Sequence, residues 1–304
     1  MNSIISPHLK AILLALLVTF LWSTSFILIK WGLTEIPPLT YAGLRYILAF
    51  VCLLPLSFTK KNKQAIKNLE RKDWLKLILL GILFICFTQG SMFMGLQLLP
   101  SVTVSLWLNF TPLVVAVMAI FLLKEYPAFL QWTGAVLFVI GIFTYFYPVR
   151  LSDNQSLGLI VMTVGVLANS GSAVLGRDVN RSGRINPYVV TLISMGFGAV
   201  VLLVVGITLQ GLPSISMQNI IYLLWLAVVN TAIAFVIWNY TLRTLSAIES
   251  SIINGTMLIQ IAVLAYIFLG EEISFKEIIG MSIAAIGAVL VQLKRRIKPK
   301  FNKS

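Results

Sequence analysis

The chain alternates between long apolar runs and short polar breaks. Ten of the runs come close to the roughly 20 residues that an α-helix needs to cross the hydrocarbon core of a bilayer. They cover residues 11–29, 39–58, 76–96, 102–123, 128–147, 156–175, 187–208, 218–240, 248–269 and 276–293. Proline, glycine or charge marks the breaks, as at Pro38, Pro100 and Gly211, and such residues end helices. The pattern predicts an all-α polytopic membrane protein with ten transmembrane helices.

Composition supports a membrane protein and excludes most other classes. Of the 304 residues, 59% are apolar and 11% are charged, whereas a soluble domain carries about 25% charged residues. The mean hydropathy of +0.95 also excludes a disordered chain. The first apolar run continues through Trp22 and Phe26 to Ile29, and no cleavage site of small residues follows it. We therefore expect it to stay as a span and not to be removed as a signal peptide.

The net charge of +13 is better explained by membrane topology than by nucleic-acid binding. The basic residues gather in a few short breaks and at the C-terminus. With the N-terminus in the cytoplasm, 19 of the 23 Lys and Arg residues lie inside, three lie outside, and Arg45 lies within a span. This bias predicts a multi-pass protein of the cell membrane with both termini cytoplasmic and residues 295–304 as a basic tail. No nucleic-acid partner is expected.

Residues for metal, disulfide or enzyme chemistry are scarce. Cys52 and Cys86 lie inside apolar runs, where free packing thiols are expected, and the single histidine, His8, precedes the first span. The sequence has neither an HExxH motif nor a phosphate-binding loop. We expect no metal, no cofactor and no catalytic residues, and therefore not an enzyme.

The chain contains a weak internal repeat with an offset of 146 residues. The matched pairs are Leu99 and Leu245, Ala116 and Ala262, Ala119 and Ala265, Glu125 and Glu271, Gly134 and Gly280, Ile140 and Ile286, and Gly141 and Gly287. Each half has five spans, and five is odd, so the second half enters the membrane in the opposite orientation. Inverted repeats are typical of secondary transporters. The alternative is that two apolar stretches match by chance.

Each half also carries glycines that share one helix face. Gly134 and Gly141 are seven residues apart, as are Gly280 and Gly287. Small residues on one stripe let membrane helices approach closely. We interpret all four glycines as packing residues.

Short motifs mark both halves. They are Leu21-Trp22-Ser23-Thr24-Ser25-Phe26 with Lys30, Leu44-Arg45 after Pro37-Pro38, Gly95-Leu96 to Pro112, Leu123-Lys124-Glu125, Asn239-Tyr240-Thr241-Leu242, and Gly270-Glu271-Glu272. Over nearly the whole chain this pattern resembles the EamA family of the drug/metabolite transporter (DMT) superfamily. The resemblance implies ten helices in two five-helix repeats, here residues 10–147 and 156–294. It also implies a small-molecule substrate, such as an amino acid, another small metabolite or a drug, and often export.

The two halves differ at positions that bear on a substrate site. The second half has Ala168-Asn169 where the first has Trp22-Ser23, Leu258 where the first has Pro112, and Ser194 near the position of Arg45. The halves are therefore expected to contribute unequally to the site.

Arg45 is the sharpest candidate for a substrate contact. It lies about seven residues into the second span, where a charge is costly and normally faces a cavity or a partner. One interpretation is a contact with an anionic group of the substrate. The other is snorkelling to the outer interface, or a bond to carbonyl groups at a helix end.

Amides and tryptophans within the spans complete the candidate site. The amides are Gln89, Asn109, Asn169, Asn230, Asn239, Asn254 and Gln260, and they are expected to face the bundle interior. For each amide, hydrogen bonding between helices is the alternative to substrate contact. Trp22 and Trp107 lie deep enough to stack on the substrate, although packing is an alternative role for both. The candidate substrate-binding set is Trp22, Arg45, Gln89, Trp107, Asn109, Asn169 and Asn254.

The sequence thus predicts a secondary transporter that moves a small metabolite by alternating access, with a membrane channel or a structural membrane subunit as the alternative. No acidic residue is expected midway through a span, because Glu125 and Glu271 lie at span ends. The coupling ion, a proton among the candidates, is therefore left open. A monomer and a homodimer fit the sequence equally well, and membrane lipid is the expected surrounding.

Overall fold

The computed structural model describes residues 6–123, 128–148, 152–181, 184–241, 244–245 and 247–292. Within these ranges the regular structure is entirely helical, as predicted. Eight helical segments are long and apolar enough to cross a membrane, and Ile253–Leu269 is a further, shorter apolar helix. The prediction of a helical, multi-pass membrane protein is therefore confirmed.

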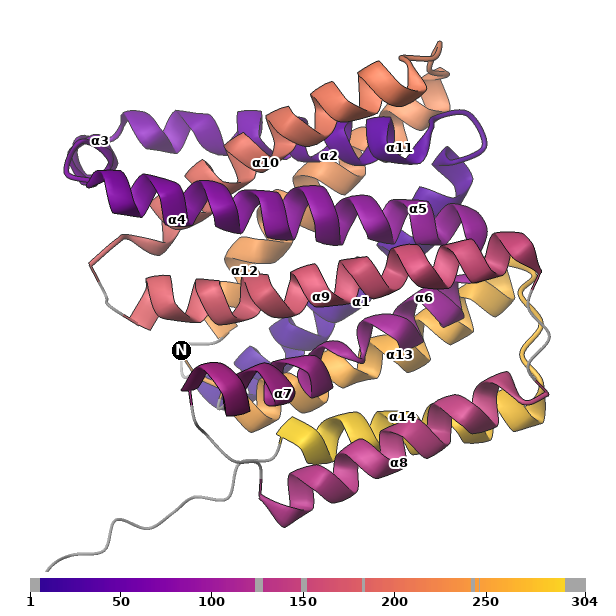
Figure 1. Cartoon of the computed structure of the whole chain (residues 1–304). Coiled ribbons are helices and arrows are strands. Elements are labelled where there is room, and N and C mark those ends of the chain that lie inside the picture. The colour runs from indigo at the N-terminus through magenta and orange to yellow at the C-terminus, as the bar shows by residue number, and fades with distance from the viewer. Residues whose placement is uncertain are drawn as a thin grey trace, which may run out of the picture.

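The helices follow the predicted apolar runs closely. The first half contains α1 (Pro7–Gly32), α2 (Pro38–Leu53), η1 (Leu54–Phe58), α3 (Lys60–Lys67), α4 (Arg71–Gly81), η2 (Ile82–Gln89), α5 (Gly90–Leu98), α6 (Ser101–Leu108), α7 (Thr111–Leu123) and α8 (Phe129–Phe146). The second half contains α9 (Asp153–Arg181), α10 (Pro187–Gln210), α11 (Met217–Ala227), η3 (Val228–Ile233), α12 (Ala234–Thr241), α13 (Ala247–Leu269) and α14 (Phe275–Gln292). Most of the helices extend from left to right in Figure 1.

Local sequence explains where several helices begin and end. The Ser6 hydroxyl caps α1 by accepting a hydrogen bond from the backbone N–H of Leu9, at 3.1 Å. Asn186 caps α10 in the same way ahead of Pro187, whose fixed φ suits the first helical position. Gly211 ends α10 at φ 79°, a conformation that glycine adopts without steric cost.

The structure carries the 146-residue repeat in its element boundaries. Four pairs of helices and one pair of π-helices begin 146 residues apart. The pairs are α1 and α9, α4 and α11, η2 and η3, α6 and α13, and α8 and α14. Chance matches between apolar stretches would not reproduce five boundaries at one offset, so the two halves share one architecture.

Corresponding helices of the two halves pack antiparallel. A Cβ added at Gly134 would lie 2.8 Å from the carbonyl oxygen of Gly287, and one added at Gly280 would lie 2.8 Å from the carbonyl oxygen of Gly141. Exchanging the halves converts the first contact into the second, as a two-fold relation between the halves requires. Helices α8 and α14 therefore approach closely at one edge of the bundle, and α2 and α10 form the equivalent pair at the opposite edge (Figure 1).

Three predicted features are refined by the structure. The fourth predicted span, 102–123, is broken at Asn109 and Phe110 between α6 and α7. The spans at 76–96 and 218–240 contain the π-helices η2 and η3, where the hydroxyls of Thr88 and Thr231 donate to carbonyl groups five residues earlier. The segment between the predicted spans 39–58 and 76–96 holds the short helix α3.

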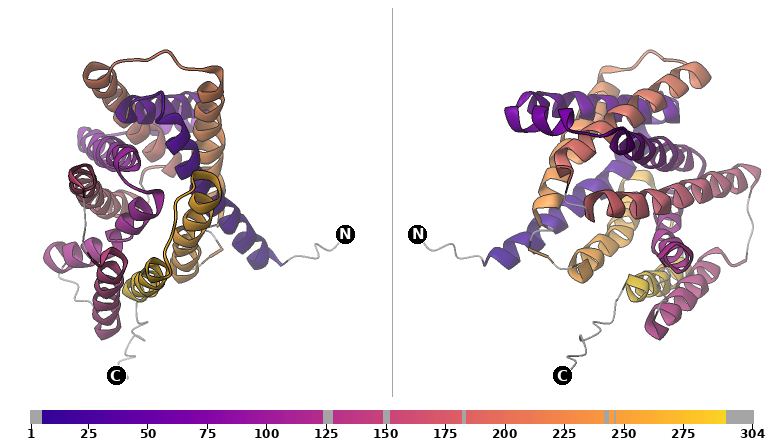
Figure 2. Two further views of the ribbon diagram at one scale, coloured as in Figure 1. Left: turned by 90° about the vertical axis from the view of Figure 1, so that its right-hand side faces the viewer. Right: turned by 60° about the vertical axis from the view of Figure 1, so that its left-hand side comes forward.

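The two largest of four buried clusters make up most of the core. The larger joins α2 and α5 to α9 and α10 and includes Tyr41, Phe93 and Met162. The second joins α6 and α8 to α13 and α14 and includes Leu106 and Phe138. Figure 2 shows the bundle from two further directions, with α8 and α14 side by side at its edge.

Candidate functional site

A cavity of about 400 Å³ is lined by both halves of the chain. The first half contributes side chains from α1, α2, η2, α5, α6 and α7, and the second contributes side chains from α9, α12, α13 and α14. Its volume falls within the range of pockets that hold small organic ligands. Six of the seven candidate substrate-binding residues line it: Trp22, Arg45, Gln89, Asn109, Asn169 and Asn254.

Arg45 is buried at the cavity wall. Its side chain is 4% exposed, and its Nε donates to the Thr231 hydroxyl on η3 at 3.0 Å. The guanidinium lies 5.4 Å from the ring centroid of Tyr46 and 6.0 Å from that of Phe93. Its Nη1 is buried and has no hydrogen-bond partner in the protein. The side chain therefore does not snorkel to an interface, and one of its donors is left for a ligand or for water.

Trp22 belongs to a contact between α1 and the second half. Its indole Nε1 donates to the carbonyl oxygen of Asn230 at 3.1 Å, and its ring packs against Phe235 and Trp238. The Asn230 amide donates in return to the Leu21 carbonyl oxygen at 2.7 Å and to the Ser25 hydroxyl at 2.8 Å. Asn230 thus joins helices, while Trp22 also lines the cavity.

Two of the cavity amides, Asn109 and Asn169, form hydrogen bonds at or beside the break between α6 and α7. The Asn109 amide donates to the Ser105 carbonyl oxygen at 2.8 Å, at the break between α6 and α7. The Asn169 amide on α9 donates to the Thr111 hydroxyl at 3.1 Å. Asn254 on α13 is exposed and lines the cavity. These partners leave the amide oxygens of Asn109 and Asn169 available as acceptors.

The remaining polar candidates lie elsewhere. Trp107 is outside the cavity lining; its Nε1 donates to the Thr163 hydroxyl at 3.1 Å, and its ring packs against Phe110 and Phe146. Gln260 joins α13 to α1 by accepting a hydrogen bond from the Ser23 hydroxyl at 2.9 Å. The side chain of Asn239 lies outside the described residues.

Sequence reasoning missed several residues of the site. Thr231 holds Arg45, and the rings of Tyr46, Phe84 and Phe235 line the cavity, but none was singled out. Thr231 follows Asn230 within an apolar run, so a polar pair in a span was the available signal. The aromatic residues gave no signal, because such residues occur on every face of a membrane helix.

A second polar site lies at the end of the bundle where α1 ends and α6 begins. The Glu271 carboxylate, from the second half, accepts hydrogen bonds from the backbone N–H groups of Ser101 at 2.8 Å and Val102 at 3.4 Å. The Lys30 ammonium donates to the Leu99 carbonyl oxygen at 2.7 Å and interacts electrostatically with Glu271. A carboxylate at a helix N-terminus is stabilised by the helix dipole.

The matching position in the other half, Glu125, lies outside the described residues. The observed bonds of Glu271 therefore concern one end of the bundle only.

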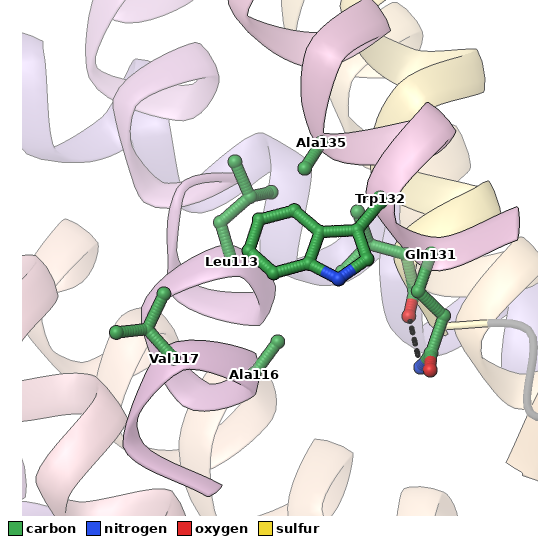
Figure 3. Close-up of a pocket in the computed structure, with 7 residues that line it drawn as sticks. Leu113, Ala116, Val117, Gln131, Trp132 and Ala135 are labelled. Atoms are coloured by element: carbon green, nitrogen blue, oxygen red, sulfur yellow. Dashed lines mark hydrogen bonds between the residues drawn. The ribbon is translucent and has the colours of Figure 1, made fainter. Parts of the chain in front are cut away.

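A smaller hollow of about 180 Å³ lies between α7, α8 and α14 (Figure 3). Its wall is formed by Leu113, Ala116, Val117 and the ring of Trp132, which is 51% exposed. The Gln131 amide, which also lines it, donates to the Val291 carbonyl oxygen at 2.9 Å (Figure 3). An apolar hollow whose one amide is already bonded has little with which to orient a polar solute.

In the described part of the chain, no three His, Cys, Asp or Glu side chains gather where they could hold a metal ion.

The sequence pattern of the EamA-like transporter family matches residues 9–147 and 156–293, which together make up most of the chain. The chain belongs to this family. EamA-like proteins are membrane transporters of the DMT superfamily, so the predicted family and the broad function are both confirmed.

Characterised and uncharacterised transporters are among the relatives of this EamA-family chain. It is 26% identical to the uncharacterized transporter YoaV of Bacillus subtilis, over 91% of this chain and 95% of that protein. It is 23% identical to the S-adenosylmethionine/S-adenosylhomocysteine transporter of Chlamydia trachomatis, over 92% of this chain and 88% of that protein. A crystal structure at 16% identity shares the fold, with a TM-score of 0.67 over 93% of this chain and 97% of the other.

Proposed function

We propose that this protein is a secondary transporter that moves a small metabolite, an amino acid or a related compound, out of the cell by alternating access. The observation that carries the proposal is the cavity at the seam of two antiparallel halves, with Arg45 and four amides in its wall. Substrate sites of inverted-repeat carriers lie at such a seam. Polar side chains inside a membrane bundle are costly, and they are therefore expected to have a function.

The proposed topology has ten membrane crossings, five in each repeat. The repeats are residues 10–147 and 156–294, and residues 295–304 form a basic tail. Both termini lie in the cytoplasm of a cell-membrane protein, since the Lys and Arg residues concentrate on that side. The antiparallel pairs of α2 with α10 and of α8 with α14 support an inverted arrangement.

The proposed substrate contacts are Trp22, Arg45, Gln89, Asn109, Asn169 and Asn254. The relative from Chlamydia trachomatis is named for two small organic solutes, S-adenosylmethionine and S-adenosylhomocysteine. This name supports a small organic substrate for the present chain. The aromatic rings of Trp22, Phe84 and Phe235 support one with an apolar or aromatic part.

The bonds of Glu271 to the N-terminus of α6 support alternating access. They join the two halves at the end of the bundle where α1 ends and α6 begins. We propose that they break when the cavity opens toward that end and form again when it closes. The same cavity would then be reached from each side in turn.

Counterflow in proteoliposomes tests the carrier assignment. Vesicles are loaded with unlabelled amino acids, and uptake of a mixture of ¹⁴C-labelled amino acids is followed. A carrier gives a transient accumulation of label above equilibrium, because it exchanges solute through a saturable site. A channel, the alternative function, gives the same flux with or without loading.

Two variants sharpen the test. Asn254→Leu removes an exposed cavity amide and is expected to abolish the accumulation of label. Thr208→Val is the control, because Thr208 lies on α10 away from the cavity and donates only to the backbone of its own helix. Equal fluxes with and without loading would refute a carrier. No flux from folded protein would refute an amino acid as the substrate class.

A further inference from the structure

The described part of the cavity wall carries one permanent charge. Among the described residues that line it, Arg45 is the only one that is charged at neutral pH, and none is Asp or Glu. Its other polar groups are amides and hydroxyls, which are neutral. The described side chains therefore give the cavity wall one positive charge.

That cation is not neutralised by a hydrogen-bonded carboxylate of the described residues. The Nε of Arg45 donates to a neutral hydroxyl, on Thr231, and its Nη1 has no partner although the side chain is 96% buried. The neighbouring Tyr46 and Phe93 rings attract the guanidinium only weakly. A buried charge without a counter-ion is unfavourable, so an anion that enters the cavity gains the attraction which the protein has left unused.

The rest of the wall determines which kind of anion the cavity can bind. Asn109, Asn169 and Gln89 line the same cavity as Arg45 and can donate or accept hydrogen bonds, and Phe84 and Phe235 supply apolar surface. An amino group would find only amide and hydroxyl oxygens as partners, with no described carboxylate in the wall to pair with. A carboxylate suits the guanidinium, which presents its N–H groups in a planar fork.

We propose that the cavity selects organic monoanions: a carboxylate binds Arg45, an apolar or aromatic body contacts the rings, and cationic amines of the same shape are rejected. This inference rests on the proposed function, since it assumes that this cavity is the substrate site. It refines the proposed substrate class, because the carboxylate of an amino acid becomes the recognised group and its ammonium an unfavourable addition.

A pair of ligands that differ only in the charged group tests the proposal. The anion 3-phenylpropionate and the cation phenethylamine share a phenyl ring and a two-carbon chain, and L-phenylalanine carries both charges. Binding to the purified full-length protein is measured by calorimetry and by the ligand-induced shift in Tm. The expected order of affinity is 3-phenylpropionate, then L-phenylalanine, then phenethylamine, with at least a ~10-fold difference between the first and the last.

Two variants connect the selectivity to Arg45. Arg45→Gln is expected to remove the preference between the anion and the cation, provided that the protein folds. Asn254→Asp leaves Arg45 in place and adds a negative charge at an exposed position of the cavity. It is expected to weaken the binding of 3-phenylpropionate by about 10-fold and to strengthen the binding of phenethylamine. The control is Gln218→Glu, which adds the same charge at an exposed position of α11 outside the cavity and keeps the original order.

Equal or tighter binding of phenethylamine to the unmodified protein would overturn the proposal, and so would the absence of binding by both ligands. An unchanged anion preference in Asn254→Asp would also overturn it. The carrier assignment fails separately: counterflow with a preference for the cation would keep the carrier and refute the charge selectivity. Selective binding of the anion without counterflow would keep the charge selectivity and refute the carrier.

Discussion

Glu271 offers a direct test of whether the two halves separate at one end of the bundle. Its carboxylate accepts hydrogen bonds from the N–H groups of Ser101 and Val102, at 2.8 and 3.4 Å, across the seam between the halves. Glu271→Gln keeps the size of the side chain and one acceptor oxygen but removes the charge. The variant therefore weakens this connection without adding bulk.

The expected effect follows from these contacts. A hydrogen bond to a charged group contributes roughly 1.5–3 kcal/mol, against about 0.5–1.5 kcal/mol for a neutral one. The lost attraction to the N-terminus of α6 adds about 0.3–1 kcal/mol. A net loss of about 1–2 kcal/mol shifts the balance between closed and open forms at this end by a factor of roughly 5–30. The variant also removes the attraction between Glu271 and the Lys30 ammonium, and this loss favours the open form as well.

Thiol labelling measures this balance. Ser105 lines the cavity and is 4% exposed, so Ser105→Cys is introduced into a protein whose Cys52 and Cys86 have been replaced. A membrane-impermeant thiol reagent is added to vesicles that expose one end of the bundle or the other. Glu271→Gln should label roughly 5–30 times faster from the Glu271 end and more slowly from the opposite end.

The matched control is Glu272→Gln, because Glu272 is adjacent and exposed. It should leave both labelling rates unchanged. Faster labelling from both ends would indicate local loosening in place of alternating access. Unchanged rates in Glu271→Gln would show that its bonds do not hold the end closed, and either result would refute the reasoning.

Two further predictions concern stability. Gly141→Ala places a methyl group against the backbone nitrogen of Ala284 and should lower the free energy of unfolding by about 1–3 kcal/mol, measured by thermal unfolding. In the control, Gly171→Ala, the added methyl meets only a leucine methyl at 3.7 Å, so this variant should be neutral or stabilising. Equal losses of stability in the two variants would contradict the close approach of α8 and α14. The hydrogen bond and charge of Lys72 lower the pKa of Glu70 below its ordinary value of 4.5. Ionised Glu70 therefore stabilises the fold above pH 4.5, and this stabilisation is lost as the pH falls through the lowered pKa. Glu70→Gln should therefore lower Tm at neutral pH, and the difference from the unmodified protein should vanish in acid; a pH-independent difference would contradict the charge interaction.

Sequence alone located nearly every helix and the repeat. Apolar length and the prolines and glycines between runs are local properties, so boundaries such as Pro187 and Gly211 could be predicted within a few residues. The 146-residue offset was visible in a few matched residues. The break at Asn109 and the π-helices could not be predicted, since they depend on which carbonyl groups neighbouring side chains and helices satisfy.

The candidate site was predicted only in part. A charge in an apolar run identified Arg45, but its partner Thr231 is 186 residues away in sequence. Four amides line the cavity, yet Gln260, of the same residue type as Gln89, joins two helices instead. Sequence gave no means to separate these roles.

The family, the helical membrane fold and the short list of polar residues within the spans thus follow from the residue pattern along the chain. Tertiary structure decided which of them face one cavity, and that Trp107 packs against Phe110 and Phe146 outside it. The physical reason lies in the surroundings of a membrane helix. Both its lipid-facing and its packed faces are apolar, so periodicity does not tell which way a side chain points. Only the packing of the two halves supplies that direction.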